Sequence, residues 1–167
     1  QSYDEYVQLI KKDADRLEEF VNYLTINVSE FYRNPDQWKI LEQDILPDLI
    51  AKAGKKLKVW SAACSTGDEP YSLAMVLGKM VGLSNVSIIA TDIDKQVLEK
   101  AKLGLYNEKS IAGLPDEYKN KYFTKIGASY KISDEIKRCV QFKQHDLLKD
   151  AYPTDCDLIV CRNVLIY

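Results

Sequence analysis

Four short apolar runs separated by longer segments constrain the fold of this chain more than any other feature. The runs occupy residues 57–63, 86–91, 140–142 and 158–161, and helical segments at 70–81 and 95–102 follow the first two. Short apolar runs that alternate with helices are typical of a parallel sheet with helices on its faces. We therefore predict an α/β fold for residues 51–167.

The first fifty residues predict helices without strands. One apolar stripe at spacings of three and four indicates a helix: Val7, Ile10, Ala14, Leu17, Val21 and Leu24. A second helix is expected to begin at Asn34-Pro35-Asp36, with Asn34 as N-cap and Pro35 in the first helical position. Its expected apolar face is Trp38, Leu41, Ile45 and Leu49. Residues 1–50 are thus expected to form an N-terminal helical region.

Composition excludes several classes of function. The chain has 167 residues and a formal net charge of −2, which argues against attraction to nucleic acid or anionic lipid as the main function. No run approaches the ~20 apolar residues of a membrane span, and the first thirty residues lack the features of a signal peptide. We expect a cytoplasmic protein that neither inserts into membranes nor binds nucleic acid.

The cysteines and the single histidine give no metal-ligand pattern. Cys64, Cys139, Cys156 and Cys161 form no CxxC pair, and His145 has no partner at ligand spacing. We therefore expect no metal site. Thiols without a signal peptide are typical of reduced, cytoplasmic proteins. For His145 we expect a local hydrogen bond in a loop rather than a catalytic role.

Polar residues follow three of the predicted strands: residues 65–69 after the first, Asp92 after the second, and His145-Asp146 after the third. In a doubly wound sheet, ligands bind at the carboxyl ends of the strands. Asp92 stands 25 residues after Gly67, near the position from which an acid accepts hydrogen bonds from the two ribose hydroxyls of a nucleotide. The sequence therefore predicts a nucleotide-type ligand at this edge.

The loop after the first strand restricts the kind of nucleotide. Residues 62–67 contain one glycine, whereas a pyrophosphate needs Gly-x-Gly-x-x-Gly, and no Gly-Lys-Ser/Thr of a P-loop is present. S-adenosylmethionine has a ribose without a phosphate, and its positive charges favour the neighbouring acids Asp68 and Glu69. Two alternatives remain open: these acids complement the dipole of a following helix, or Asp92 is an N-cap or a solvated turn residue.

Four segments of the chain resemble the CheR-type chemotaxis receptor methyltransferases, in the order of that family and over nearly the whole chain. They are Asn27-Val-Ser-Glu-Phe-Tyr-Arg33, Trp60-Ser-Ala-Ala-Cys-Ser-Thr-Gly-Asp-Glu-Pro-Tyr-Ser72, Ala90-Thr-Asp-Ile-Asp94 and Cys161-Arg-Asn-Val-Leu-Ile-Tyr167. The resemblance implies a Rossmann-like, S-adenosylmethionine-dependent methyltransferase sheet. It also implies a protein-glutamate O-methyltransferase that acts in chemotaxis on the cytoplasmic helices of membrane chemoreceptors.

The same resemblance implies the roles of individual residues. Glu69 would hold the methionine moiety and Asp92 the ribose, and the full set of cofactor-binding positions would be Asn27, Ser29, Arg33, Glu69, Asp92, Asp146, Leu147, Arg162 and Asn163. The catalytic positions near the methyl group would be Arg33, Arg162 and Tyr167. The chain departs from the family at Asp68, where glutamate is usual, and at Asp146, where asparagine is frequent.

A glutamate substrate would explain the scarcity of histidine. A glutamate side chain is already ionised at neutral pH, with a pKa of about 4.3, so the reaction needs no general base. The enzyme has to align the carboxylate, the methyl group and the sulfur in a dry pocket. Arg33 and Arg162 are candidates for this alignment because guanidinium binds carboxylate in a fixed geometry.

Other functions remain open. A methyltransferase acting on a small molecule or another protein is one alternative, and a non-catalytic module that binds the cofactor or docks on a receptor is another. A nucleic-acid methyltransferase is disfavoured because Cys161-Arg162-Asn163-Val164 stands where Asp/Asn-Pro-Pro-Tyr/Phe would hold a flipped base.

Residues 103–137 give no clear secondary-structure pattern. The resemblance implies a small inserted subdomain around 105–142, and residues 122–142 are the candidates for the small antiparallel subdomain of that family. The family's sheet has further strands after the last motif, so we expect a C-terminally truncated methyltransferase domain. Such a chain should bind the cofactor weakly and associate through an open sheet edge.

Overall fold

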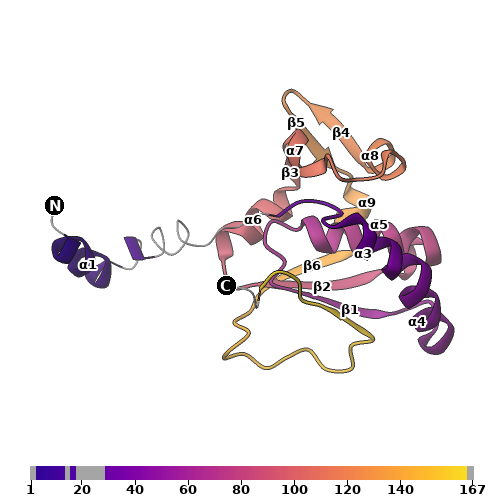
Figure 1. The fold of residues 1–167 in the computed structure, drawn as a ribbon, viewed down its shortest axis with the longest axis horizontal. Coiled ribbons are helices and arrows are strands. Elements are labelled where there is room, and N and C mark those ends of the chain that lie inside the picture. The colour runs from indigo at the N-terminus through magenta and orange to yellow at the C-terminus, as the bar shows by residue number, and fades with distance from the viewer. Residues whose placement is uncertain (1–2, 14–15, 18–28, 165–167) are drawn as a thin grey trace.

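The computed structural model describes residues 3–13, 16–17 and 29–164. Its centre is a four-stranded parallel sheet in the order β6-β2-β1-β7 (Figure 1). The strands are β1 (Lys58–Ala62), β2 (Ser87–Asp92), β6 (Val140–Gln144) and β7 (Leu158–Val160). Each begins and ends within two residues of a predicted apolar run, so the predicted α/β fold is confirmed.

The strand order creates a switch point beside β1. The chain leaves β1 toward β2 and β6 on one side, and then returns to place β7 on the other side of β1. Because all pairs are parallel, Ala62 lies opposite Thr91, and Asp92 opposite Gln144, at the same carboxyl edge. A crevice at the carboxyl ends, where the strand order reverses, is the usual ligand position in such sheets.

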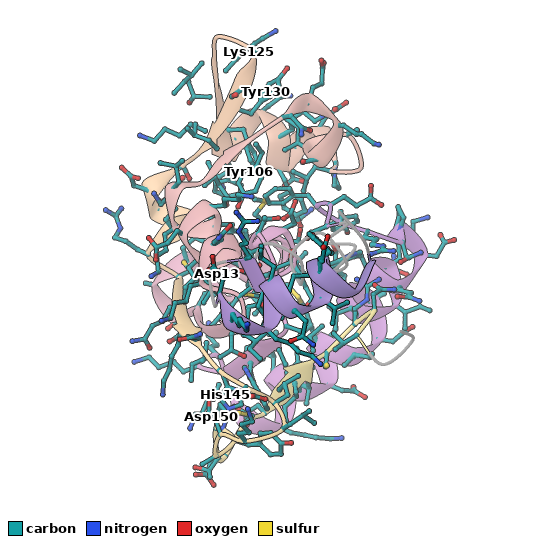
Figure 2. The ribbon with its side chains drawn as sticks, turned by 90° about the vertical axis from the view of Figure 1, so that its left-hand side faces the viewer. Asp13, Tyr106, Lys125, Tyr130, His145 and Asp150 are labelled. Atoms are coloured by element: carbon teal, nitrogen blue, oxygen red, sulfur yellow. The ribbon has the colours of Figure 1, made fainter. Side chains whose placement is uncertain are left out.

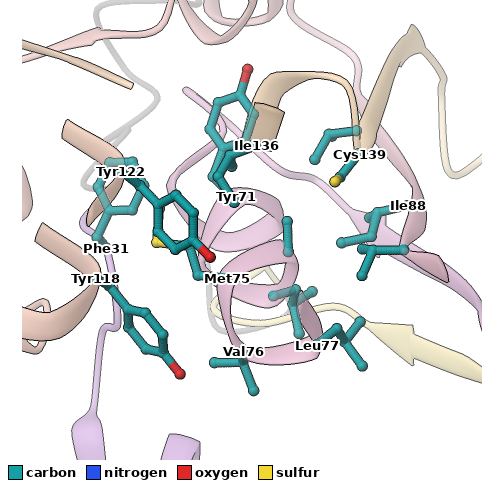
Figure 3. Close-up of a cluster of buried hydrophobic side chains, with 14 of the residues drawn as sticks. Phe31, Tyr71, Met75, Val76, Leu77, Ile88, Tyr118, Tyr122, Ile136 and Cys139 are labelled. Carbon is teal, nitrogen blue, oxygen red and sulfur yellow. The ribbon is translucent and has the colours of Figure 1, made fainter. Parts of the chain in front are cut away.

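Helix α5 (Asp68–Val81) lies in the middle of the hydrophobic core. Its residues 70–77 are all buried, as expected for a helix that is covered on every side. Figure 3 shows Ile88 of the sheet on one side of α5, and Phe31, Tyr118 and Tyr122 on the other. The helix therefore joins the sheet to a second layer of the molecule.

Helix α6 (Lys95–Leu103) follows β2 directly. Its N-cap is Asp94, whose carboxylate accepts hydrogen bonds from the amides of Gln96 (2.7 Å) and Val97 (3.4 Å). The cap fixes the chain immediately after Asp92, which is the candidate ribose acid.

The second layer is a small subdomain between α6 and β6. It contains an antiparallel sheet in the order β3-β5-β4, formed by β3 (Leu105–Tyr106), β4 (Phe123–Ile126) and β5 (Ser129–Ile132). The short helices α7 (Glu108–Ile111), α8 (Asp116–Tyr122) and α9 (Asp134–Lys137) complete it. Figure 2 shows Tyr106, Lys125 and Tyr130 at this end of the molecule, and His145 and Asp150 at the opposite end. Strands of two to four residues are too short to give a periodic apolar pattern, so the secondary structure of this region could not be predicted from the sequence.

The N-terminal part contains α1 (Tyr3–Lys12), α3 (Pro35–Ile40) and α4 (Leu46–Ala53). Of the predicted first stripe, Ile10 is buried and Leu17 is 45% exposed, while Ala14, Val21 and Leu24 lie outside the described residues. Trp38 and Leu46 belong to the same hydrophobic cluster as the sheet residues, so the second helical segment packs onto the sheet core.

The predicted apolar face of the second helical segment is partly wrong. A π-helical turn, η1 (Leu41–Ile45), joins α3 to α4. Leu46 is fully buried, whereas Ile45, which was predicted to face the core, is 43% exposed. A π turn accommodates one more residue than an α turn, so the positions after it are rotated relative to a 3.6-residue period. Pro47 follows at once and lacks the amide that a regular helix would use there.

The predicted capping by Asn34 is also wrong in its detail. Asn34 precedes Pro35 as expected, but it adopts a left-handed conformation (φ 61°) and its side chain makes no cap hydrogen bond. The side-chain oxygen instead accepts a hydrogen bond from Arg162, at 3.0 Å. The residue is therefore used in a contact between distant parts of the chain.

Within the part of the chain that the structure describes, no helix has the length and apolar character needed to cross a bilayer. The same residues contain no group of three or more His, Cys, Asp and Glu side chains arranged to hold a metal ion.

Candidate functional site

The loop after β1 crosses the carboxyl edge of the sheet in a tight backbone path. The amide of Cys64 donates to the carbonyl of Thr91 at 2.8 Å, which ties the loop to β2. Ala63 and Ser65 both have positive φ angles, which is uncommon for residues with a side chain and is frequent at functional sites. Gly67 also has a positive φ, and a Cβ there would lie 2.9 Å from the Cβ of Ala101. Only glycine fits this position.

Asp92 lies at the end of β2 and is bound to the loop. One carboxylate oxygen accepts the amide of Ser65 at 2.8 Å, and the other accepts the amide of Asp94 at 3.0 Å. Burial raises the pKa of the Asp92 carboxyl above its ordinary value, and these backbone hydrogen bonds oppose that shift. Asp92 therefore ties the end of β2 to the loop after β1.

The two acids that follow Gly67 differ in their surroundings. Asp68 is 1% exposed, and one of its carboxylate oxygens accepts a hydrogen bond from the hydroxyl of Thr66 at 2.5 Å. Burial raises the pKa of Asp68, and hydrogen bonds from Thr66 and Ser29 lower it. Its other oxygen, Oδ1, is buried without a hydrogen-bond partner among the described residues. Asp68 is thus enclosed by the protein.

Glu69 stays partly accessible. It accepts a hydrogen bond from the hydroxyl of Ser61, in β1, at 2.8 Å. Burial raises the pKa of Glu69, whereas the Ser61 hydrogen bond and the charge of Arg162 lower it. Of the two acids, Glu69 is the one placed between the loop after β1 and the end of β7.

Arg162 follows β7 and faces the N-terminal segment. Its Nη2 donates to the carbonyl of Arg33 (2.9 Å), to Oδ1 of Asn34 (3.0 Å) and to Oε1 of Gln37 (2.7 Å). The guanidinium also lies over the ring of Trp38, 5.9 Å from its centroid. Burial lowers the pKa of Arg162, the charge of Glu69 raises it, and the charge of Arg33 lowers it. The two arginines and Glu69 therefore share one electrostatic environment.

The segment before α3 connects this site to the subdomain. The amide of Phe31 donates to the carbonyl of Ser110, and the ring of Phe31 packs edge-on against Tyr106, with centroids 4.7 Å apart. The amide of Tyr32 donates to Ser72 of α5 at 3.1 Å. Ser29 and Arg33 are thereby brought to the same edge of the sheet as Asp68 and Arg162. Asn27 and Tyr167 lie outside the described residues.

The chain after β6 forms the remaining side of the edge. The amide of His145 donates to the carbonyl of Asp92 at 2.9 Å, which places Asp146 and Leu147 beside the β2 acid. Asp146 accepts the amide of Leu148 at 2.9 Å and pairs with Lys149 at 3.5 Å, so its carboxylate organises the turn. The ring of His145 contacts the carbonyl of Ala151 at 3.2 Å, which confirms the local loop contact that we predicted for it.

Several residues of this edge were missed in the sequence. Ser61 holds Glu69, Trp60 donates its Nε1 to Thr91 at 2.9 Å, and Asn34 and Gln37 hold Arg162. Asn163 was predicted, and it is exposed with a positive φ of 59°. The contacts of Arg162 join residues more than 120 positions apart, so no local pattern signals them.

The charges and amides of this edge fit S-adenosylmethionine. The amide of Ser65 is already bound by Asp92, so it is not available to a pyrophosphate. Three carboxylates, of Asp68, Glu69 and Asp92, line the loop after β1, and an anionic phosphate would be repelled there. A cationic ligand with a ribose suits these groups, and Arg162 offers a partner for a ligand carboxylate.

The comparisons with known proteins agree with this assignment. The family model described as the SAM-binding domain of CheR methyltransferases matches residues 27–167. A chemotaxis protein methyltransferase of Listeria monocytogenes is 43% identical over 166 residues, which cover 99% of this chain and 63% of that protein.

More distant relatives carry similar names. Chemotaxis protein methyltransferase 1 of Pseudomonas aeruginosa is 36% identical and chemotaxis protein methyltransferase 2 of Vibrio cholerae is 34% identical. This chain covers 65% and 62% of their lengths, so it spans somewhat under two thirds of the length of such relatives. The predicted resemblance is confirmed, S-adenosylmethionine is the cofactor of the matched domain, and the chain belongs to the family of CheR methyltransferase SAM-binding domains.

Proposed function

We propose that this chain binds S-adenosylmethionine at the carboxyl edge of its sheet and transfers the methyl group to glutamate side chains of chemoreceptor cytoplasmic helices. The observation that carries the proposal is the arrangement of Asp92, Glu69 and Arg162 at the switch point of a sheet that matches the CheR family model. The names of the relatives support the chemotaxis role.

In this proposal different residues of the carboxyl edge bind different parts of the cofactor. Asp92 accepts the ribose hydroxyls, Glu69 faces the ammonium of the methionine moiety, and Asp146 and Leu147 border the adenine. Asn27, Ser29 and Asn163 complete the cofactor side of the pocket. The bound cofactor supplies an activated methyl group on a positively charged sulfur.

The substrate carboxylate needs orientation rather than activation. At neutral pH it is already the nucleophile, so no residue has to remove a proton. Arg33 and Arg162 are proposed to hold the carboxylate by charge-assisted hydrogen bonds, and Tyr167 to orient one oxygen. Exclusion of water favours the transfer, because the negative charge of the substrate carboxylate and the positive charge of the cofactor sulfur both decrease during the reaction.

The organisation of the chain follows from the same proposal. Residues 1–50 would be a helical region, and residues 51–167 a methyltransferase domain with the small subdomain inserted around 105–142. Because the proposed substrates are cytoplasmic segments of receptors, the protein would act in the cytoplasm.

The type of bond formed tests the substrate class. The protein is incubated with a receptor cytoplasmic fragment and S-adenosylmethionine that carries a labelled methyl group. A methyl ester on glutamate should release the label as methanol in mild base. Label that resists base would indicate N-methylation and would contradict the proposal. A receptor fragment with its acceptor glutamates changed to alanine serves as the control and should remain unlabelled.

A further inference from the structure

The guanidinium of Arg162 is held from one side by the beginning of α3. Within the described part of the chain, all of its hydrogen bonds use Nη2, and the three acceptors belong to Arg33, Asn34 and Gln37. The shortest of the three, at 2.7 Å, goes to the side chain of Gln37. The face of the guanidinium lies over Trp38. These contacts fix the direction of a long side chain at the end of an edge strand.

The acceptors themselves are rigidly placed. Trp38 is 3% exposed and its Nε1 donates to the carbonyl of Arg33 at 3.0 Å, so the first turn of α3 is anchored in the core. Pro35 fixes the backbone at the start of the helix. Gln37 projects from this anchored turn, and its own side chain is exposed. The contribution of Gln37 is therefore a directed hydrogen bond rather than burial of apolar surface.

We propose that Gln37, assisted by Asn34, is a positioning residue that holds the Arg162 guanidinium beside Glu69 and the bound cofactor. This inference rests on the proposed function, because it assigns Arg162 to the cofactor. An arginine side chain that is free to rotate loses rotamer entropy when it is fixed, and a preformed contact reduces that loss at the moment of binding. Gln37 thus acts through Arg162 and does not touch the ligand.

The test is a double-mutant cycle on the affinity for S-adenosylhomocysteine, measured by calorimetry. Gln37→Met keeps the length of the side chain and removes the acceptor, whereas Gln37→Glu keeps an acceptor. Gln43 is a matched control: it is an exposed glutamine of the same helical segment, and no hydrogen bond of the described residues involves its side chain. Gln43→Met should therefore bind like the unmodified chain.

We expect Gln37→Met to weaken binding about tenfold, since it removes one hydrogen bond to a charged group. Gln37→Glu should restore affinity to within about twofold. In an Arg162→Ala background, Gln37→Met should have no further effect, because the group that it positions is gone. Thermal unfolding of each variant, compared with Gln43→Met, checks that the fold is intact.

Two results would overturn the inference while leaving the proposed function in place. One is unchanged affinity in Gln37→Met when the unmodified chain binds the ligand. The other is a loss that persists in the Arg162→Ala background. An unmodified chain that fails to bind would count against the proposed function itself.

A second readout needs no ligand. The NMR signal of the Arg162 side chain should report faster rotation of the guanidinium in Gln37→Met than in Gln43→Met. Equal rotation in both variants would overturn the positioning contact.

Discussion

At the scale of single residues, the carboxyl edge of the sheet concentrates acids whose charge is costly to bury. Burial raises the pKa of Asp68, of Glu69 and of Asp92 above their ordinary values. The folded protein therefore binds more protons than the unfolded chain between the ordinary and the raised values. The contribution of these three carboxyls to stability is greatest below their ordinary pKa, and it falls as the pH rises through their raised pKa in the folded state.

Asp68 tests this dependence because it is the most buried of the three. Replacement by asparagine keeps an acceptor for the Thr66 hydroxyl and removes the buried charge. The free energy of unfolding of Asp68→Asn should decrease less than that of the unmodified chain as the pH rises from 4 to 8, as measured by urea denaturation. An identical decrease in both proteins would show that the burial of this charge has no effect on stability.

Asp92 should matter for ligand binding as well as for the loop that it holds through the amides of Ser65 and Asp94. Asp92→Ala removes the acceptor of the ribose hydroxyls and should weaken S-adenosylhomocysteine binding by about 1–3 kcal/mol, while Asp92→Asn should lose less. Calorimetry measures both affinities, and Asp44→Ala, at an exposed site on η1, provides a control. An affinity that Asp92→Ala does not change would remove Asp92 from the ribose site.

The residues of the site differ in how far the sequence could predict them. Asp92 could be predicted from the sequence because its position depends on strand spacing, which is a local property. The roles of Asn34 and Gln37 could not be predicted from the sequence, because they depend on contacts with Arg162, which is more than 120 positions away. The sequence also gave no sign that Asp68 is enclosed while Glu69 stays partly accessible, since both follow the same glycine and differ only in their direction from α5.

At the scale of elements, the main departure from the predicted pattern is the π turn between α3 and α4. Its effect on packing can be measured with two neighbouring residues. Leu46→Ala should destabilise the protein by about 2–5 kcal/mol, because Leu46 is fully buried. Ile45→Ala should cost less than about 1 kcal/mol, because Ile45 is largely exposed. Equal losses in urea denaturation, or a larger loss at Ile45, would show that the helix is regular at this point.

Elements with a strong period were predictable, and elements without one were not. Each strand of the central sheet begins with or contains a short apolar run, and α5 begins within two residues of its predicted start. The strands of the subdomain are too short to show a periodic apolar pattern. The sequence predicted only that the tyrosines of this region are packing residues, and Tyr106, Tyr118 and Tyr122 are indeed buried. The positions of Tyr106 and Tyr118 depend on contacts with Phe31 and Tyr32, which come from a distant part of the chain.

At the scale of the whole molecule, the two edges of the central sheet differ in chemistry. The β6 edge carries Lys143 and two glutamines, which oppose pairing with another chain. The β7 edge is apolar, and Ile159 on it is 54% exposed. Among the described residues, β7 pairs only with β1. A polypeptide that consists of these 167 residues alone is therefore expected to self-associate through β7.

Sedimentation velocity can test the role of this edge. Ile159→Lys should shift the protein toward the monomer, because a lysine on an edge strand opposes pairing. Gln141→Lys, on the opposite edge strand, should leave the distribution unchanged. A monomeric unmodified chain, or equal effects of both substitutions, would contradict association through β7.

The central claim is that the carboxyl edge of the sheet binds S-adenosylmethionine, and a titration with S-adenosylhomocysteine followed by amide NMR tests it most directly. The largest shifts should occur at the amides of Ser65, Asp94 and Leu148, which lie at that edge. Amides at the opposite end of the strands, such as Lys58 and Ser87, should change little. Shifts confined to that opposite end, or no shifts at saturating ligand, would contradict the assignment of the site.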